Sequence, residues 1–423
     1  MMSAPTDRSF ADRLDAEDPL RALRSEFQLP LDKSGNAKLY FCGHSLGLQP
    51  LRAKQLVVEE LDAWARQGVD AHFESTRPWV SYHERLTPML ATLTGAHQSE
   101  VVAMNSLTVN LQLLLTTFYR PTRERYKILI EHGAFPSDRY AVASQLQMHG
   151  FDPAKSLLEI APHEGESHVR MADMEALIER EGDSIALVLL PGVQYLTGQC
   201  FDMEHCTRIA QRRGCYVGLD LAHAIGNVPL ALHDWNADFA VWCSYKYLNG
   251  GPGAIGGAFI HERHERTQLP RLAGWWGHDK DSRFSMPQHF AALPGAEGWQ
   301  LSNPPILAMA PLLASLELFE RASMPALRTK SLRLTGYLMQ LLQARLQGRM
   351  TLLTPTEDDA HGAQVSLRLN SVEIGASLRQ RLSEAAIVCD WRGADLLRVA
   401  PVPSYNTFVE VWKLIDALVE MTA

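Results

Sequence analysis

Short apolar runs alternate with longer amphipathic stretches through the middle of the chain, and this alternation limits the fold more than any other feature of the sequence. The apolar runs, which predict strands, cover residues 126–131, 184–190, 215–221, 239–243 and 254–261. The amphipathic stretches have the three- and four-residue apolar spacing of helices, and they cover residues 105–118, 171–180 and 203–213. Strands that alternate with helices are typical of an α/β domain with a mainly parallel sheet.

A different texture begins after the proline pair 304–305. Stretches rich in Leu, Ala and Arg predict helices over residues 306–319, 325–346 and 372–386. Thr407 and Glu410 have the spacing of a capping box, and apolar residues repeat at helical spacing after them. We therefore expect an N-terminal arm (1–54) that packs with the small domain, a large domain (55–305) and a smaller α+β domain (306–423).

Composition and charge disfavour several classes of protein. The net charge of −8 and the lack of Lys/Arg clusters argue against a nucleic-acid partner. No window reaches the roughly 18 consecutive apolar residues of a membrane span, and the first residues lack the apolar core of a signal peptide. The 6 cysteines form no CxxC pair, so the sequence predicts neither a disulfide framework nor a zinc site. We expect a cytoplasmic protein that needs no metal.

Residues 220–257 carry the strongest chemical signal. Asp220 ends an apolar strand, and Lys246 follows another one, between two tyrosines and before a glycine-rich segment. The carboxyl ends of strands in open α/β sheets hold ligands, so both side chains are expected near one ligand site. Poor solvation there favours the uncharged, nucleophilic form of the lysine amine. Taken alone, Lys246 could equally be a surface lysine.

Together, Asp220 and Lys246 match the requirements of pyridoxal 5'-phosphate (PLP). A lysine amine bonds to the aldehyde of this cofactor, and an acid keeps its pyridine nitrogen protonated so that the ring accepts electrons. The nearby glycines let the backbone approach a ligand closely. The pair is far more specific than either residue by itself.

Further segments extend this match along the chain. They are CGHSLGLQP (42–50), RPW (77–79), MNSLTVNL (104–111), FPSD (135–138), DLAHAIGN (220–227), CSYKYLNGGPG (243–253), GWWGH (274–278), SNPP (302–305) and RVAPVP (398–403). With them, the sequence resembles the kynureninase family of class-V, fold-type-I PLP enzymes over nearly its whole length. The resemblance implies the transferase-like α/β fold of that group, with a mainly parallel sheet in the large domain and a smaller α+β C-terminal domain.

The resemblance also implies which residues bind the cofactor. Lys246 would bond covalently to PLP, Asp220 would hold the proton on the pyridine nitrogen, and Phe135 would stack on the ring. Leu107 and Thr108 would bind the phosphate at the start of a helix, where free N–H groups favour an anion. The other implied contacts are Pro136, Ser137, Asp138, His223, Tyr245, Trp275 and Asn303.

Several of these residues have a simpler interpretation. Phe135 could be a core residue, and Thr108 and Asp138 could be ordinary helix caps. Trp275 could anchor an interface without touching the cofactor. The sequence alone leaves these alternatives open.

On the substrate side, the resemblance implies that Arg398 binds an α-carboxylate and that Ser45, His72 and Asn303 surround the aromatic end of the substrate. Arg398 in a surface ion pair and His72 as a surface histidine are the simpler alternatives. His44 stands where the family usually has Asn, beside the retained Ser45.

The implied activity is hydrolysis of L-kynurenine or 3-hydroxy-L-kynurenine. Its products would be L-alanine and anthranilate or 3-hydroxyanthranilate, in tryptophan catabolism and de novo NAD synthesis. Lys246 would move a proton, and Tyr245 would either do the same or only anchor the phosphate. The family also implies a homodimer in which some cofactor contacts cross the interface.

Other functions find less support. Residues 251–256 match GxGxxG but contain a proline and precede a strand, which disfavours an NAD-dependent dehydrogenase. His261 and His264 lack the spacing of a zinc protease and are expected at a solvated strand end. Asp220 and Lys246 alone leave open an aminotransferase, a β-lyase or a cysteine desulfurase. Cys389, however, lies in an apolar run that predicts a strand, whereas a desulfurase needs its thiol on a mobile loop.

Overall fold

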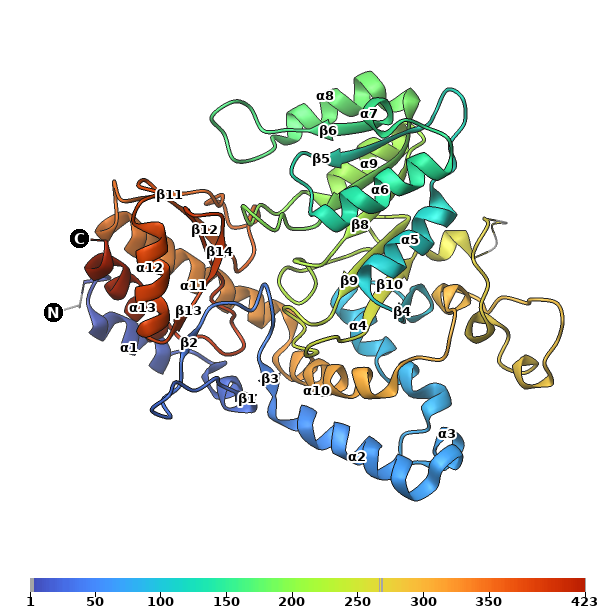
Figure 1. Cartoon of the computed structure of the whole chain (residues 1–423), viewed down its shortest axis with the longest axis horizontal. Helices are drawn as coiled ribbons and strands as arrows, with labels where there is room; N and C mark the ends of the chain where they lie inside the picture. Colours follow the sequence, from blue (N-terminus) through green and yellow to red (C-terminus); the bar gives the residue numbers. More distant parts are fainter. Residues whose placement is uncertain (1–3, 266, 268, 423) are drawn as a thin grey trace.

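The computed structural model describes residues 4–422 except 266 and 268, and a seven-stranded sheet lies at its centre (Figure 1). In spatial order the strands are β4 (Val101–Ala103), β10 (Gly256–Ile260), β9 (Phe239–Cys243), β8 (Tyr216–Asp220), β7 (Ile185–Pro191), β5 (Lys127–Glu131) and β6 (Leu157–Ile160). Strand β10 is antiparallel to both of its neighbours, and the other pairs are parallel. The mainly parallel α/β sheet predicted from the sequence is confirmed, and all five predicted strands belong to it.

Helices cover both faces of this sheet because the strand side chains are apolar on both sides. One core lies under α5 (Leu107–Phe118) and α6 (Pro136–Met148). The core on the other face lies under α4 (Thr87–Thr94), α8 (Met171–Glu181), α9 (Met203–Arg212) and α10 (Ile306–Ala322). Helix α2 (Leu51–Gln67) packs on α10. The result is three layers, with the strand ends left free for chemistry.

The C-terminal part has its own four-stranded antiparallel sheet and its own core. The strand order is β11 (Met350–Leu352), β12 (Val365–Leu369), β15 (Leu396–Val399) and β14 (Asp390–Arg392). Its helices are α11 (Met324–Arg345), α12 (Gly375–Glu384) and α13 (Phe408–Met421). The capping box predicted at the start of α13 is present, with the Thr407 hydroxyl accepting from the Glu410 N–H and the Glu410 carboxylate accepting from the Thr407 N–H.

The first residues of the chain pack on this C-terminal part. Helix α1 (Arg8–Ala16) lies beside α13, and β2 (Leu39–Tyr40) pairs with β13 (Ile387–Val388) in parallel (Figure 1). Helix α10, which the sequence assigned to the small domain, contributes its side chains to the core of the large sheet. The division of the chain at residue 305 stays a prediction.

The remaining elements are short. They are the strands β1 (Phe27–Gln28) and β3 (Gln49–Pro50), the helices α3 (Ala71–Glu74) and α7 (Pro153–Ser156), and the 3-10 turns η1 (Arg21–Glu26), η2 (Gly68–Asp70), η3 (Trp79–Arg85), η4 (Gln98–Glu100), η5 (Gly182–Ser184), η6 (Glu262–His264), η7 (Trp275–Gly277), η8 (Arg283–Ser285) and η9 (Ala296–Trp299). Residues 251–256 lead into strand β10 and not into a helix, unlike a dinucleotide-binding loop.

The prediction that His261 and His264 lie at a solvated strand end is wrong. Both side chains are buried just after β10. The His264 Nε2 lies 2.8 Å from the Asp238 carboxylate, and the His261 Nδ1 lies 3.4 Å from the Glu100 carboxylate. Each histidine is therefore buried because its ring pairs with a buried carboxylate at the end of β10.

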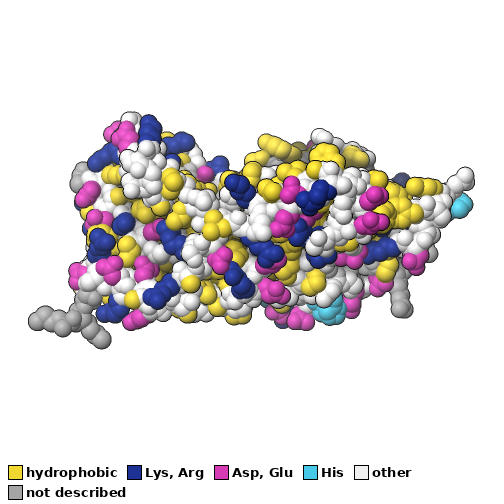
Figure 2. Space-filling view, turned by 90° about the horizontal axis from the view of Figure 1, so that it is seen from below, with side chains coloured by type: hydrophobic (Ala, Val, Ile, Leu, Met, Phe, Trp, Pro, Cys, Tyr) yellow, Lys and Arg dark blue, Asp and Glu magenta, His cyan; other side chains and the backbone are white. Residues whose placement is uncertain are grey.

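Charged side chains of both signs are interspersed with apolar ones on the face that Figure 2 shows. Helix α2 lies toward this face, and it exposes Leu51, Val58, Leu61 and Trp64. Within the described part of the chain, every helix is too short or too polar to cross a lipid bilayer.

Candidate active site

A cavity opens where β5, β7, β8 and β9 end. We call this side of the sheet, formed by the carboxyl ends of the parallel strands, the carboxyl edge. The cavity together with its open mouth comprises about 570 Å³ of space outside the protein atoms. Glu131, Pro191 and Asp220 are the last residues of β5, β7 and β8, and Lys246 follows β9. The residues that line this Lys246 cavity are Leu107, Thr108, Glu131, Phe135, Ser137, Asp138, Pro191, Val193, Tyr195, Asp220, Ala222, His223, Tyr245 and Lys246.

Lys246 is half-buried between two aromatic rings. Its Nζ lies 5.9 Å from the centre of the Phe135 ring and 5.8 Å from the centre of the Tyr245 ring. Phe135 precedes α6, whose first turn brings Ser137 and Asp138 to the same cavity. An amine placed in this way faces the open space and can react with a carbonyl there.

Three carboxyl groups converge on the floor of the cavity. Burial, followed by the charge of Asp220 and a hydrogen bond with it, raises the pKa of Asp138 well above its ordinary value. Burial raises the pKa of Glu131 to about 8, although a hydrogen bond from Gln194 opposes this effect. Glu131 is therefore neutral at pH 7, and burial favours the neutral form of Asp138 as well.

Two neutral histidines lie behind this floor. Burial, and then the positive charge of Lys246, lowers the pKa of His223 well below its ordinary value. Burial lowers the pKa of His44 to about 4. The ring centres of His44 and His223 are 6.3 Å apart. An uncharged His223 suits a flat contact with a cofactor ring better than an ionic one.

The start of α5 forms the wall opposite Lys246. Its N-cap, Ser106, is extended and makes no side-chain cap bond, so the first N–H groups of the helix remain available. Gly256 lies against this turn, and a Cβ placed on it would lie 3.1 Å from the Leu107 nitrogen. A helix start of this kind favours an anion such as phosphate.

The residues present fit PLP. Asp138 Oδ1 and His223 Nδ1 are buried without a hydrogen-bond partner in the described chain, and both residues line the cavity. A bound polar molecule would supply hydrogen-bond partners for both atoms. A cavity that binds nothing would leave these two buried polar atoms unpaired and unexplained. The helix start at Leu107 and Thr108 supplies an anion site at the same cavity.

Arg398 lies just behind the cavity wall. Its Nε donates to Asp390 Oδ2 at 2.6 Å, its Nη2 bonds the same oxygen, and its Nη1 donates to the Tyr195 carbonyl at 2.5 Å. Asp390 also lies 3.8 Å from His44 Nε2. Burial would raise the pKa of Asp390, but the nearby His44 ring and the charge and hydrogen bonds of Arg398 outweigh it and lower the pKa to about 2. Three of the five N–H groups of Arg398 are thus occupied, and one on each terminal nitrogen remains for a carboxylate.

Some predicted site residues do not line the cavity in the single chain. Ser45 and Asn303 are exposed, and Pro136 serves as the first residue of α6. His72 packs edge-on against Trp79, with the ring centres 5.1 Å apart. Trp275 is 43% exposed.

His72 and Trp275 nevertheless belong to one exposed aromatic cluster. Phe73 lies next to His72 and 5.8 Å from Phe284, and Phe284 lies 5.6 Å from Trp275, measured between ring centres. The family segments around 72 and 275 are thus presented together on the surface.

Sequence reasoning missed several residues of the site. Glu131 ends the predicted strand 126–131 and carries the same signal that singled out Asp220, a carboxylate that ends an apolar strand. Tyr195 lies in a loop after β7, and Asp390 lies on β14 far along the chain. No local pattern in the sequence marks these two.

Comparison with known proteins agrees with this geometry. The family model described as kynureninase C-terminal domain matches residues 327–418. A kynureninase of Myxococcus xanthus is 54% identical over 411 residues, which are 97% of this chain and 96% of that protein. A kynureninase of Koribacter versatilis is 52% identical over 98% of this chain and 97% of its own length. The chain belongs to the kynureninase family.

Solved structures place the fold of this kynureninase family member among PLP enzymes. A cysteine desulfurase of Escherichia coli aligns with a TM-score of 0.77 at 16% identity, over 95% of this chain and 98% of its own. A mutant of the enzyme C-DES, with glycine covalently linked to its PLP cofactor, aligns with a TM-score of 0.75 at 18% identity, over 90% of this chain and 96% of its own. The fold class predicted from the sequence is confirmed.

Proposed function

We propose that the chain is a PLP-dependent kynureninase that hydrolyses L-kynurenine, 3-hydroxy-L-kynurenine or both to L-alanine and the matching aromatic amine. The observation that carries the proposal is the meeting of Lys246, Asp220, Phe135 and the start of α5 in one cavity. The chain is also at least half identical to kynureninases over nearly its full length.

Each cavity residue has a task that follows from its position. When bound, PLP supplies an aldehyde that bonds to amines and a protonated ring that takes up the electron pair freed at the substrate α-carbon. With PLP bound, Lys246 would hold it through its aldehyde carbon, and the lysine amine, once free, would move the substrate α-proton. Asp220 would keep the ring nitrogen protonated, and the N–H groups at Leu107 and Thr108 would bind the phosphate.

Burial of Glu131 and Asp138 supports this assignment of roles. Burial favours the neutral form of both carboxyl groups, so it limits the negative charge that they bring to the cavity. A neutral carboxyl group donates a hydrogen bond as well as accepting one. Asp138 can therefore hold a polar edge of the ring without competing for its proton.

Tyr245 is the proton donor that we assign to the cleavage step. Burial, with the nearby Cys243 thiol, raises the pKa of Tyr245 above its ordinary value, so its hydroxyl keeps its proton. The ring lies beside Lys246 and faces the cavity. A protonated phenol can pass a proton to the carbon released when water has added to the γ-carbonyl and the Cβ–Cγ bond breaks.

Arg398 binds the α-carboxylate of the substrate in this proposal. The two N–H groups that remain on its terminal nitrogens form a fork that matches a carboxylate. Asp390 holds the guanidinium from the other side and fixes its orientation.

A second copy of the chain completes the substrate end of the site. We infer a homodimer in which the exposed aromatic cluster of His72, Phe73, Trp275 and Phe284 covers the cavity of the partner. Exposed rings grouped in this way on a protein surface support an interface. Ser45 and Asn303, which are exposed as well, are proposed to join this contact. We further propose that the enzyme acts in the cytoplasm.

Cysteine desulfurases share this fold, but the raised pKa of the Cys389 thiol disfavours desulfurase activity in this chain. Burial raises the pKa of this thiol well above its ordinary value, and Cys389 lies between β13 and β14. A desulfurase nucleophile needs an accessible thiolate.

The test is an assay of the PLP-loaded protein with L-kynurenine and with 3-hydroxy-L-kynurenine. We expect alanine and the aromatic amine in equal amounts from at least one of the two, and the ratio of kcat/KM values gives the preference. Cofactor bound to Lys246 without either product would overturn the proposal and direct the search to transamination or β-elimination.

A further inference from the structure

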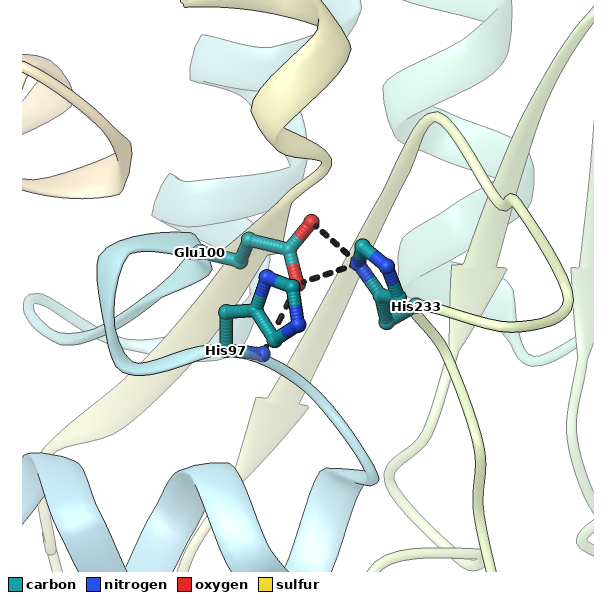
Figure 3. A group of neighbouring side chains, drawn as sticks. All are labelled: His97, Glu100 and His233. Atoms are coloured by element: carbon teal, nitrogen blue, oxygen red, sulfur yellow. Dashed lines mark hydrogen bonds and ion pairs between the residues drawn. The ribbon is translucent and has the colours of Figure 1, made fainter.

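Five titratable side chains meet at the opposite edge of the seven-stranded sheet, and we call them the Glu100 cluster. His97 caps the turn η4 before β4 and Glu100 is its last residue, His233 lies between β8 and β9, and His261 and Glu262 follow β10. Figure 3 shows His97 and Glu100 on one segment and His233 on another, with the three side chains pointing toward one another.

Glu100 is the centre of the cluster and is fully buried, with 0% of its surface exposed. Its two carboxylate oxygens lie 3.0 and 3.1 Å from His233 Nδ1, as the dashed lines in Figure 3 mark. The backbone N–H groups of His97 and Glu262 each donate to the carboxylate at 2.9 Å. His97 Nδ1 lies 3.0 Å from Glu262 Oε2.

The imidazole rings of the cluster are in close contact. The centres of the His97 and His233 rings are 3.9 Å apart, and those of the His233 and His261 rings are 5.0 Å apart. Three imidazolium ions at such distances would repel one another.

Neither of the two carboxylates pairs with a lysine or an arginine in the described part of the chain. Among the described residues, the ion pairs of Glu100 are all with histidines, and that of Glu262 is with His97. Arg263, the nearest guanidinium in the sequence, pairs with Asp238 instead, and Asp234 adds further negative charge near His97. Burying a carboxylate is costly unless a cation compensates for it.

A second cluster of the same kind shows the contrast. His83, Glu84 and Glu297 also bring three possible ligand atoms together. There, the Lys280 ammonium lies 3.0 Å from Glu84 and 2.7 Å from Glu297, so a protein cation already occupies the position. The Glu100 cluster has imidazoles where the other cluster has a lysine.

We propose that His97, Glu100 and His233 bind a divalent transition-metal ion, with Zn²⁺ the best match. Their ligand atoms all lie within 4.8 Å of one another, and two imidazole nitrogens with one carboxylate oxygen form a ligand set that Zn²⁺ commonly takes. Glu262 or a water molecule fills the fourth position. Because His97 is exposed, a rotation of its side chain closes the set around an ion.

This site lies away from the Lys246 cavity. In the pairing of β10 with β9, Gly256 is opposite Cys243 at the carboxyl edge, and Ile260 is opposite Phe239 at the other edge. His261 is thus separated from the carboxyl edge by the length of a five-residue strand, about 15 Å. The ion ties η4 to the loop between β8 and β9 and takes no part in the reaction.

Equilibrium dialysis of the PLP-loaded protein against Zn²⁺ tests the proposal. We compare the unaltered protein, His97→Ala and His163→Ala at pH 7.5 and at pH 5.5. His163 is a matched control because it is about as exposed as His97 and pairs with a single carboxylate, that of Asp173. We expect one Zn²⁺ per chain with the unaltered protein and with His163→Ala, and binding about tenfold weaker or worse with His97→Ala. At pH 5.5 all three should bind less, because protonated imidazoles cannot act as ligands.

No Zn²⁺ bound at micromolar concentration, or equal affinity in His97→Ala and the control, would overturn the proposal. The kcat/KM value of the enzyme serves as a separate measure. It should be the same after treatment with a chelator as before, so that loss of the metal site and loss of the proposed kynureninase activity are distinguished.

Discussion

The pKa values of buried carboxyl groups are shifted in opposite directions at the two edges of the seven-stranded sheet. At the carboxyl edge, burial raises the pKa values of Glu131 and Asp138, and Asp138 Oδ1 has no partner in the described chain. At the other edge, burial would raise the pKa of Asp238, but the hydrogen bond from His264 and the charge of Arg263 outweigh it, and the pKa is lowered. Polar groups left unpaired around a hollow mark the ligand site, whereas paired ones support the fold.

Replacement of Lys246 should have the largest effect. Lys246→Ala removes the amine that binds the cofactor and moves the proton, so we expect kcat to fall by about 10³-fold or more. The melting temperature of the cofactor-free protein should stay unchanged, because Lys246 is only half-buried and none of the described ion pairs includes it. Turnover assays and thermal unfolding measure the two effects. Appreciable activity in Lys246→Ala would contradict the assignment, and the exposed Lys33→Ala is the control.

Replacement of Asp238 should reduce stability and leave activity nearly unchanged. Asp238→Asn leaves Arg263 and His264 without their anion and should reduce the free energy of unfolding by about 3 kcal/mol. The kcat/KM value of the protein that remains folded should change little, because Asp238 lies at the edge away from the cavity. Urea denaturation measures the loss. The same loss in Asp234→Asn, an exposed neighbour, would show that pairing at Asp238 is not the cause.

Asp390→Asn should weaken substrate binding more than catalysis. The neutral amide oxygen of Asn accepts the two bonds from Arg398 more weakly than the carboxylate does, so Arg398 is held less firmly. We expect KM to rise about tenfold, with kcat retained within about twofold. Asp395→Asn, on the same hairpin but paired with the exposed Arg368, should leave KM unchanged. An unaltered KM in Asp390→Asn would remove Asp390 from the site.

Glu131→Gln should have the smallest effect, visible in the pH dependence of stability. The pKa of Glu131 is raised on folding from 4.5 to about 8, so its contribution to stability is complete below pH 4.5 and is lost as the pH rises toward 8. Gln stays neutral, so the fall in melting temperature of the cofactor-free protein between pH 5 and pH 8 should be smaller in the variant. Glu124→Gln, an exposed residue before β5, should follow the unaltered protein. Parallel curves for all three proteins would contradict the buried state of Glu131.

The sequence predicted those parts of the fold in which the local pattern and the tertiary environment agree. Strands β5, β7, β8, β9 and β10 are apolar and buried on both faces, so each appears as a continuous apolar run. Strand β4 has three residues, and β6 is a partly exposed edge strand with a glutamate inside it, so neither stands out. In the C-terminal part, the apolar run around Cys389 predicted a strand where β13 and β14 lie, whereas β11 was missed because it is three residues long and incompletely buried.

The candidate site divides along a similar line. Asp220 and Lys246 are recognisable because a charged residue at the end of an apolar strand is unusual, and family segments added Phe135, Leu107 and Thr108. Asp390, His44 and Tyr195 meet around Arg398 only through the fold, since they come from positions up to 346 residues apart. The Glu100 cluster was equally out of reach, because its members come from three separate segments.

The contact between the two ends of the chain has a consequence for biosynthesis. Helix α1 packs on α13, and β2 pairs with β13. These N-terminal elements can therefore pack only after the C-terminal elements have been synthesised. The strands of the large sheet all lie within residues 101–260, so that sheet can form while the ribosome is still translating the rest. The arm that carries His44 has its binding surface only after the final helix emerges. Closure of the wall around Arg398 is therefore a late, long-range folding step, and a nascent chain stalled before α13 should hold the large sheet folded and the N-terminal arm sensitive to protease.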